Sequence, residues 1–83
     1  MQKPIPWKAP AAIAVKRRGE AEFHPKIAGL TLNAALDYAI NADLPPGEAI
    51  CLWVNWHGEE VWVQGKRILQ LAADPDRPSL ASS

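Results

Sequence analysis

The sequence has a single cysteine, Cys51, and no excess of either charge, since nine basic residues balance nine acidic ones. One cysteine excludes an intramolecular disulfide, which favours a reducing cytoplasm over secretion. A net charge of zero argues against nucleic acid as the main partner, because duplex-binding domains usually carry a basic excess. The chain also lacks a run of about 18 apolar residues, so we expect no membrane span. The first ten residues do not contain the apolar core of a signal peptide.

Groups that carry catalysis or bind metals are scarce as well. The serines stand at Ser79, Ser82 and Ser83, and the only histidines are His24 and His57. These residues and the single cysteine do not show the spacing of a metal site or of a nucleophile with its base. The five glycines stand singly, so there is no phosphate-binding loop. We therefore expect no enzyme activity, no metal and no cofactor.

The length of 83 residues fits one domain with a modest core. Prolines punctuate residues 1–10, which predicts an extended arm that packs through Ile5 and Trp7. Residues 74–83 hold two prolines and no apolar period, which is typical of a flexible C-terminal tail. Residues 11–73 are then expected to form a single α+β domain.

The strongest helix signal runs from Thr31 to about Ala42. Its apolar residues have the spacing of an amphipathic helix and are Leu32, Ala35, Leu36, Ala39 and Ile40. Thr31 is expected to cap the start, and Pro45 with Pro46 ends the pattern. Asn33, Asp37 and Asn41 are predicted to lie on the exposed face.

Two β-hairpins are predicted around this helix. The first joins Ala11–Val15 to Ala21–Phe23 through residues 17–19, with Ile13 opposite Phe23, and residues 24–29 serve as a connector. The second joins Ala49–Trp56 to Glu60–Gln64 around His57 and Gly58. Residues 67–73 fit either a strand or a short helix, and we favour a strand. The expected fold is therefore α+β, a small antiparallel sheet in the order ββαβββ with one amphipathic helix packed on one face.

The register of the second hairpin separates two sets of side chains. Val54 pairs with Val61 and Leu52 with Val63 on the core face, whereas Trp53 stands opposite Trp62 on the other face, with Asn55 and Glu60 beside the pair. Exposed tryptophans are common anchors of protein interfaces. The alternatives are that Trp7 of the arm, or the first hairpin, covers this face as a second core, or that the face forms a dimer contact.

Basic residues gather at two expected turns, Arg17 with Arg18 and Lys66 with Arg67. They suit the rim of an interface with a protein or, as an alternative, a contact to phosphates. Glu20 and Glu22 weaken the local positive field, so a solvated turn is the simpler interpretation.

These patterns favour a small non-catalytic protein-binding module, and no motif carries a resemblance to a family. The size alone is similar to that of small host-directed proteins of phages and mobile elements, which favours an inhibitor or adaptor that masks a host or neighbouring protein. The expected partner-binding residues are Trp53, Trp62, Asn55, Glu60, Arg17, Arg18, Lys66 and Arg67. A homodimer is expected because a small open sheet has edges to cover. The alternatives are a nucleic-acid accessory protein that uses the basic turns and tryptophan stacking, and a structural assembly subunit.

Overall fold

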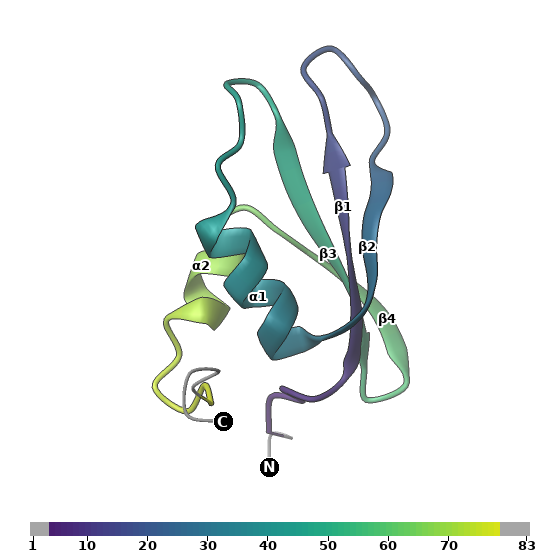
Figure 1. Ribbon diagram of the computed structural model, residues 1–83. Coiled ribbons are helices and arrows are strands. Elements are labelled where there is room, and N and C mark those ends of the chain that lie inside the picture. The colour runs from purple at the N-terminus through teal and green to yellow at the C-terminus, as the bar shows by residue number, and fades with distance from the viewer. Residues whose placement is uncertain (1–3, 79–83) are drawn as a thin grey trace.

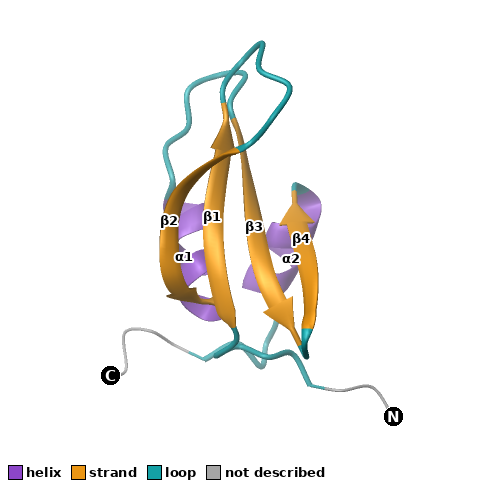
Figure 2. Cartoon of the chain, turned by 90° about the vertical axis from the view of Figure 1, so that its right-hand side faces the viewer, coloured by secondary structure: helices purple, strands orange, loops and turns teal. Residues whose placement is uncertain are grey.

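The computed structural model describes residues 4–78, which form a four-stranded antiparallel sheet with two helices on one face (Figure 1). The strands lie in the order β2-β1-β3-β4. In chain order the elements are β1 (Pro10–Lys16), β2 (His24–Thr31), α1 (Leu32–Asn41), β3 (Ala49–Trp56), β4 (Glu59–Gln64) and α2 (Lys66–Ala72). The expected α+β class and the amphipathic helix packed on an antiparallel sheet are confirmed. Figure 2 shows both helices on one side of the sheet, and no described helix or strand lies over the other side.

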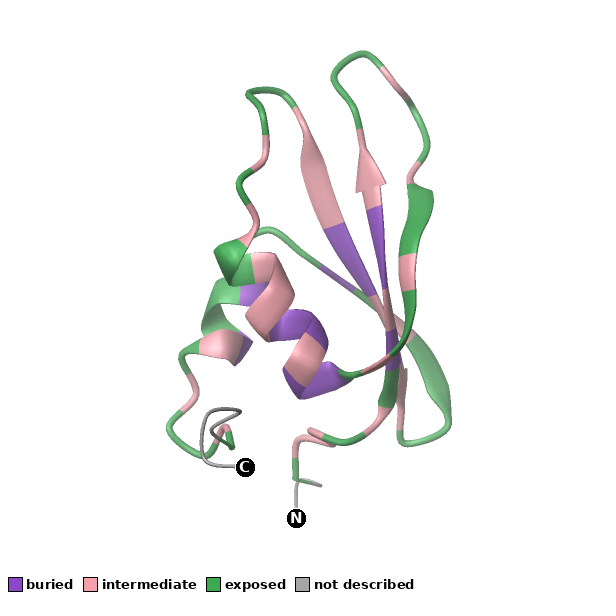
Figure 3. Ribbon diagram, viewed as in Figure 1, coloured by how far each residue is buried: buried purple, intermediate pink, exposed green. Residues whose placement is uncertain are grey.

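Helix α1 starts where the sequence predicts. The Thr31 hydroxyl accepts a hydrogen bond from the Ala34 backbone N–H at 3.1 Å, which satisfies one of the free donors of the first turn. Leu32, Ala35 and Leu36 are fully buried against the sheet (Figure 3). The prediction that Asn33 is exposed is wrong, because Asn33 is buried under the chain that follows α2.

The hairpin of β3 and β4 has the predicted register. Leu52 pairs with Val63 and Val54 with Val61, and this face packs under the helices. The turn consists of His57 and Gly58, whose φ angles of 52° and 89° are both positive. Two left-handed residues match the twist of a two-residue hairpin, so this local signal fixes the pairing.

The predicted first hairpin is wrong in its second strand. β2 covers His24–Thr31 instead of Ala21–Phe23, and Ile13 pairs with Ile27, whereas Phe23 lies under the Lys16 ammonium at 5.2 Å. The later strand is favoured because it brings two apolar residues, Ile27 and Leu30, to the core. Pro25 is tolerated because β2 is an edge strand, and bulges in the pairing with β1 absorb the irregular backbone.

The preference for a strand at residues 67–73 is also wrong, since α2 is a helix. Ile68 and Leu71 are buried, whereas Leu69 and Gln70 are exposed. A spacing of three residues places both apolar side chains on one face of a helix, whereas a strand through Ile68 would turn Gln70 towards the core. Helix α2 therefore completes the core that α1 leaves open over β4.

The arm contacts the core beside α1. The backbone N–H groups of Leu32 and Asn33 donate to the carbonyls of Ala9 and Trp7 at 2.9 and 3.0 Å, and Ile5 and Trp7 pack against the core cluster. Trp7 therefore packs against the core, and its carbonyl accepts a hydrogen bond from the first turn of α1. In residues 4–78 no helix is long and apolar enough to cross a membrane.

Candidate functional site

The uncovered face of the sheet carries the paired tryptophans. Trp53 and Trp62 are direct cross-strand neighbours, as the sequence predicts. Because side chains alternate along a strand and Leu52 and Val54 point to the core, both indoles project from the opposite face. Trp53 is half-buried and Trp62 is 56% exposed. A large amphipathic surface is thus available on this face.

A shallow groove of about 180 Å³ lies next to the pair, and we call it the tryptophan groove. Only apolar residues line it, namely Ala12, Ile13, Ala14, Pro25, Trp53 and Trp62. Ala12 stands beside Trp53 in the sheet, and Ala14 stands between Cys51 and Pro25. Small side chains on β1 between larger ones on its neighbours produce the hollow. A partner's apolar side chain can enter it and contact an indole on one side.

Two other predicted site residues adjoin the tryptophans. Asn55 pairs with Glu60 two residues further towards the β3–β4 turn, so both lie on the same face as the indoles. Asn55 is half-buried and Glu60 is exposed. Polar groups at the margin of an apolar patch are typical of a protein interface. The structure therefore brings together four of the eight predicted residues.

The basic residues lie elsewhere, at the other end of the sheet. Arg17 and Arg18 follow the end of β1, which pairs with the start of β3, and Lys66 and Arg67 begin α2 just after β4. Trp53 lies four residue positions beyond the start of β3 at Ala49, a distance of about 13 Å. The Arg18 side chain lies against Gly47, where an added Cβ would approach it to 2.8 Å. The basic pairs are thus outside the tryptophan groove.

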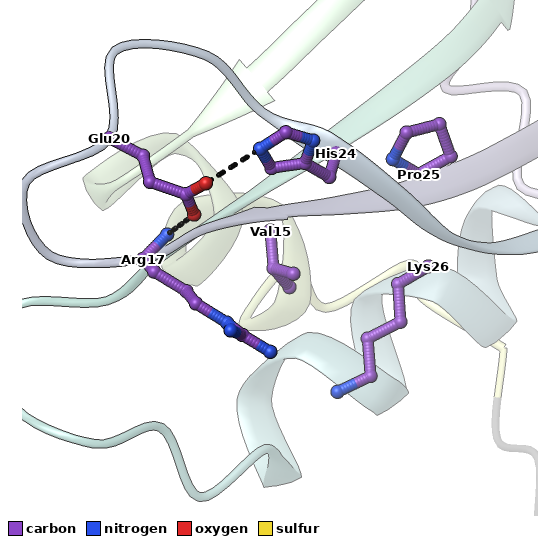
Figure 4. A pocket seen from close by; sticks show the side chains of 6 residues that line it. All are labelled: Val15, Arg17, Glu20, His24, Pro25 and Lys26. Atoms are coloured by element: carbon purple, nitrogen blue, oxygen red, sulfur yellow. Dashed lines mark hydrogen bonds and ion pairs between the residues drawn. The ribbon is translucent and has the colours of Figure 1, made fainter.

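A second hollow, of about 460 Å³, lies in the hairpin between β1 and β2, and we call it the hairpin hollow (Figure 4). Its lining residues are Val15, Arg17, Glu20, His24, Pro25 and Lys26. The Glu20 carboxylate accepts from the Arg17 backbone N–H at 3.0 Å and from His24 Nε2 at 2.9 Å. The Arg17 N–H, followed by His24, lowers the pKa of Glu20.

The bonds to Glu20 predict a pH effect on the hairpin loop. The Glu20 carboxyl is expected to titrate below the pKa of a glutamate in an unfolded peptide, so its bonds persist above that lowered pKa and are lost as the pH falls through it. A carbon-detected NMR titration of the side-chain carboxyl measures this pKa. His24→Ala should raise it only in part, because the Arg17 N–H remains. A midpoint at or above the unfolded value would show that the loop bonds do not form in solution.

Sequence reasoning missed this hollow because it placed the second strand too early. The sequence pattern predicts Glu20 beside the turn, opposite Lys16, and His24 in a connector, whereas the structure makes residues 17–23 a loop that ends where His24 starts β2. The apolar residues Ile27 and Leu30 could have indicated the correct strand, because they are the residues of β2 that pack against the core.

The remaining candidates for chemistry are spread apart. His57 Nε2 donates to the Pro4 carbonyl at 2.9 Å, His24 is bonded to Glu20, and Cys51 is buried so that desolvation raises the pKa of its thiol. Between Pro4 and Pro78 no three His, Cys, Asp or Glu side chains are grouped to hold a metal ion. The serines at positions 79, 82 and 83 lie outside the described residues.

Comparisons with protein-family models, curated proteins and solved structures found no match to this chain.

Proposed function

We propose that this chain is a non-catalytic protein-binding module whose contact surface is the tryptophan groove. The observation that carries the proposal is Trp62, which is 56% exposed beside Trp53 on a sheet face that no helix or strand of residues 4–78 covers. The other exposed large apolar residues, Ile40 and Leu69, lie on the two helices and have no such aromatic neighbour in the sheet. An aromatic anchor beside an apolar hollow is the arrangement that most often dominates binding energy.

The proposed mode of action is steric masking. An apolar side chain of a host or neighbouring protein fills the groove, the indoles flank it, and Asn55 and Glu60 provide polar contacts at the margin. The module acts as an inhibitor or adaptor of the kind made by phages and mobile elements, because a bound target surface is hidden from its usual partners. Arg17, Arg18, Lys66 and Arg67 contribute long-range steering from the far end of the sheet.

The proposal also includes a cytoplasmic location and a homodimer. A single buried thiol suits the reducing cytoplasm. The sheet ends in β2 and β4, whose outer edges are unpaired within the described residues, and pairing of such edges favours a homodimer. Pro25 and Lys26 on β2 oppose edge pairing, so β4 is the better edge for a second copy.

Replacing Trp62 by alanine is expected to weaken target binding at least tenfold, with a larger loss in the Trp53→Ala/Trp62→Ala double variant. Pull-downs from nuclease-treated lysate of the cells that express the protein, followed by titration of the captured protein, measure this change. Because Trp62 is largely exposed, the single variant should retain the circular dichroism spectrum of the wild type. Leu69→Ala, which removes an equally exposed apolar side chain from α2, is the matched control and should bind normally.

Three outcomes would contradict the proposal. Equal binding by wild type and Trp62→Ala would move the contact away from the groove. Capture that disappears with nuclease treatment would favour a nucleic-acid accessory protein that uses the basic residues. Capture of copies of the chain alone would favour a structural assembly subunit.

A further inference from the structure

The hairpin hollow holds two cations that face one space. Arg17 extends from the loop after β1, and Lys26 extends from β2. Figure 4 shows both side chains projecting to the same side of the hairpin with their charged ends turned towards each other. Like charges repel, so a convergent pair creates a local positive potential that attracts an anion.

One acid, Glu20, offsets part of the charge of this pair, but neither cation forms an ion pair with it. Within the part of the chain from Pro4 to Pro78, the two ion pairs join His24 to Glu20 and Arg77 to Asp37, and neither includes Arg17 or Lys26. Glu20 is the only acid in the lining, and both of its oxygens are already bonded, one to the Arg17 backbone and one to His24. Glu20 thus holds the loop closed, whereas the guanidinium and the ammonium stay available to a ligand.

The charge and shape of the hollow select the ligand class. Arg17 and Lys26 supply two positive charges against the one negative charge of Glu20, so the space is net positive. A phosphate monoester, with a charge of about −2 near neutral pH, is attracted to it more strongly than a phosphodiester or a single carboxylate. The guanidinium offers a planar fork of donors to two phosphate oxygens, and the ammonium adds a point charge. Val15 lines the same space with apolar surface, and the volume of about 460 Å³ exceeds what a bare phosphate needs.

We propose that the hairpin hollow binds a small organic phosphate monoester, with Arg17 and Lys26 on the phosphoryl group and Val15 against the organic part. This site is separate from the tryptophan groove, although Pro25 borders both. The module therefore has a small-molecule site next to its protein-binding face. The inference does not depend on the proposed function, since it rests on different side chains.

Suitable probes are phenyl phosphate, inorganic phosphate and a short single-stranded oligonucleotide. Two-dimensional NMR of the full chain measures their binding through changes in the amide chemical shifts. Phenyl phosphate is expected to shift the amides of residues 15–26 at millimolar concentration and to bind more tightly than inorganic phosphate. Arg17→Gln and Lys26→Gln should each weaken phenyl phosphate binding about tenfold, the size of one charge-assisted contact. Both side chains are exposed, so the variants should fold normally.

Arg67→Gln and Lys66→Gln are matched controls, because each removes the same charge from an exposed position on α2. They should bind phenyl phosphate like the wild type, and so should Trp62→Ala, which tests the protein-binding face instead. Equal weakening by the variants and the controls would overturn the proposal in favour of diffuse attraction. No shift with phenyl phosphate, or tighter binding of the oligonucleotide, would overturn it as well.

Discussion

Leu52→Ala is expected to lower the free energy of unfolding by about 2 to 5 kcal/mol, the range for a large buried side chain cut back to a methyl group. Leu52 is fully buried in β3, where Ile13 and Val63 are its neighbours across the sheet. The loss combines the transfer of apolar surface with the cavity left between the sheet and the helices. A domain of this size has on the order of 4 to 12 kcal/mol of stability in total, so this single change leaves a marginal fold.

Urea denaturation followed by tryptophan fluorescence and circular dichroism measures this loss. Leu69→Ala is the matched control, because it is the same substitution at a position that is 61% exposed. It should change the free energy of unfolding by no more than about 0.5 kcal/mol. A cost for Leu52→Ala as small as that of the control would place Leu52 outside the core and contradict the register of β3 with β1 and β4.

The parts of the fold that the sequence predicted correctly are those that local patterns determine. The stripe of α1 with its Thr31 cap specifies a helix without reference to the rest of the chain. His57 and Gly58 specify a tight turn, and the turn fixes every pair of β3 with β4, including Trp53 with Trp62. The central element of the candidate site was therefore readable before any tertiary contact was known.

The mistaken parts depend on contacts between distant segments. β2 begins at His24 because Ile27 and Leu30 gain burial beside β1 and α1, although Pro25 and Gly29 are poor strand residues. Helix α2 forms because Ile68 and Leu71 meet the core above β4 from one side. Burial that depends on distant segments cannot be predicted from a local sequence pattern. Local propensity therefore predicted the wrong element both at β2 and at α2.

The hairpin hollow was missed for the same reason. Arg17 and Lys26 are nine positions apart, and only the late start of β2 brings them to one space. An early strand at residues 21–23 would pair Lys16 with Glu20 and leave Lys26 in a connector. The charged residues of this chain therefore become informative only after the register of its edge strand is known.

Arg77→Ala is expected to lower the free energy of unfolding by about 1 to 3 kcal/mol, because it leaves a buried amide without its partner. Arg77 Nε donates to Asn33 Oδ1 at 2.7 Å, and Asn33 Nδ2 donates to the Pro78 carbonyl at 2.9 Å. Asn33 is only 5% exposed in the first turn of α1. Arg77 also donates to the Ala72 carbonyl at 3.3 Å, so one side chain joins the segment after α2 to both helices.

A double-mutant cycle separates this bond from the general cost of each truncation. If the buried pair stabilises the fold, Asn33→Ala and Arg77→Ala together cost less than the sum of the single changes, with a coupling of about 0.5 to 3 kcal/mol. Asp37→Ala should cost no more than about 1 kcal/mol, because its contact with Arg77 Nη2 spans 3.6 Å and Asp37 is half exposed. Arg67→Ala, an exposed arginine on α2, should have almost no effect. Strictly additive costs for Asn33 and Arg77 would mean that the residues after α2 do not anchor α1, and urea denaturation of the five variants decides between these results.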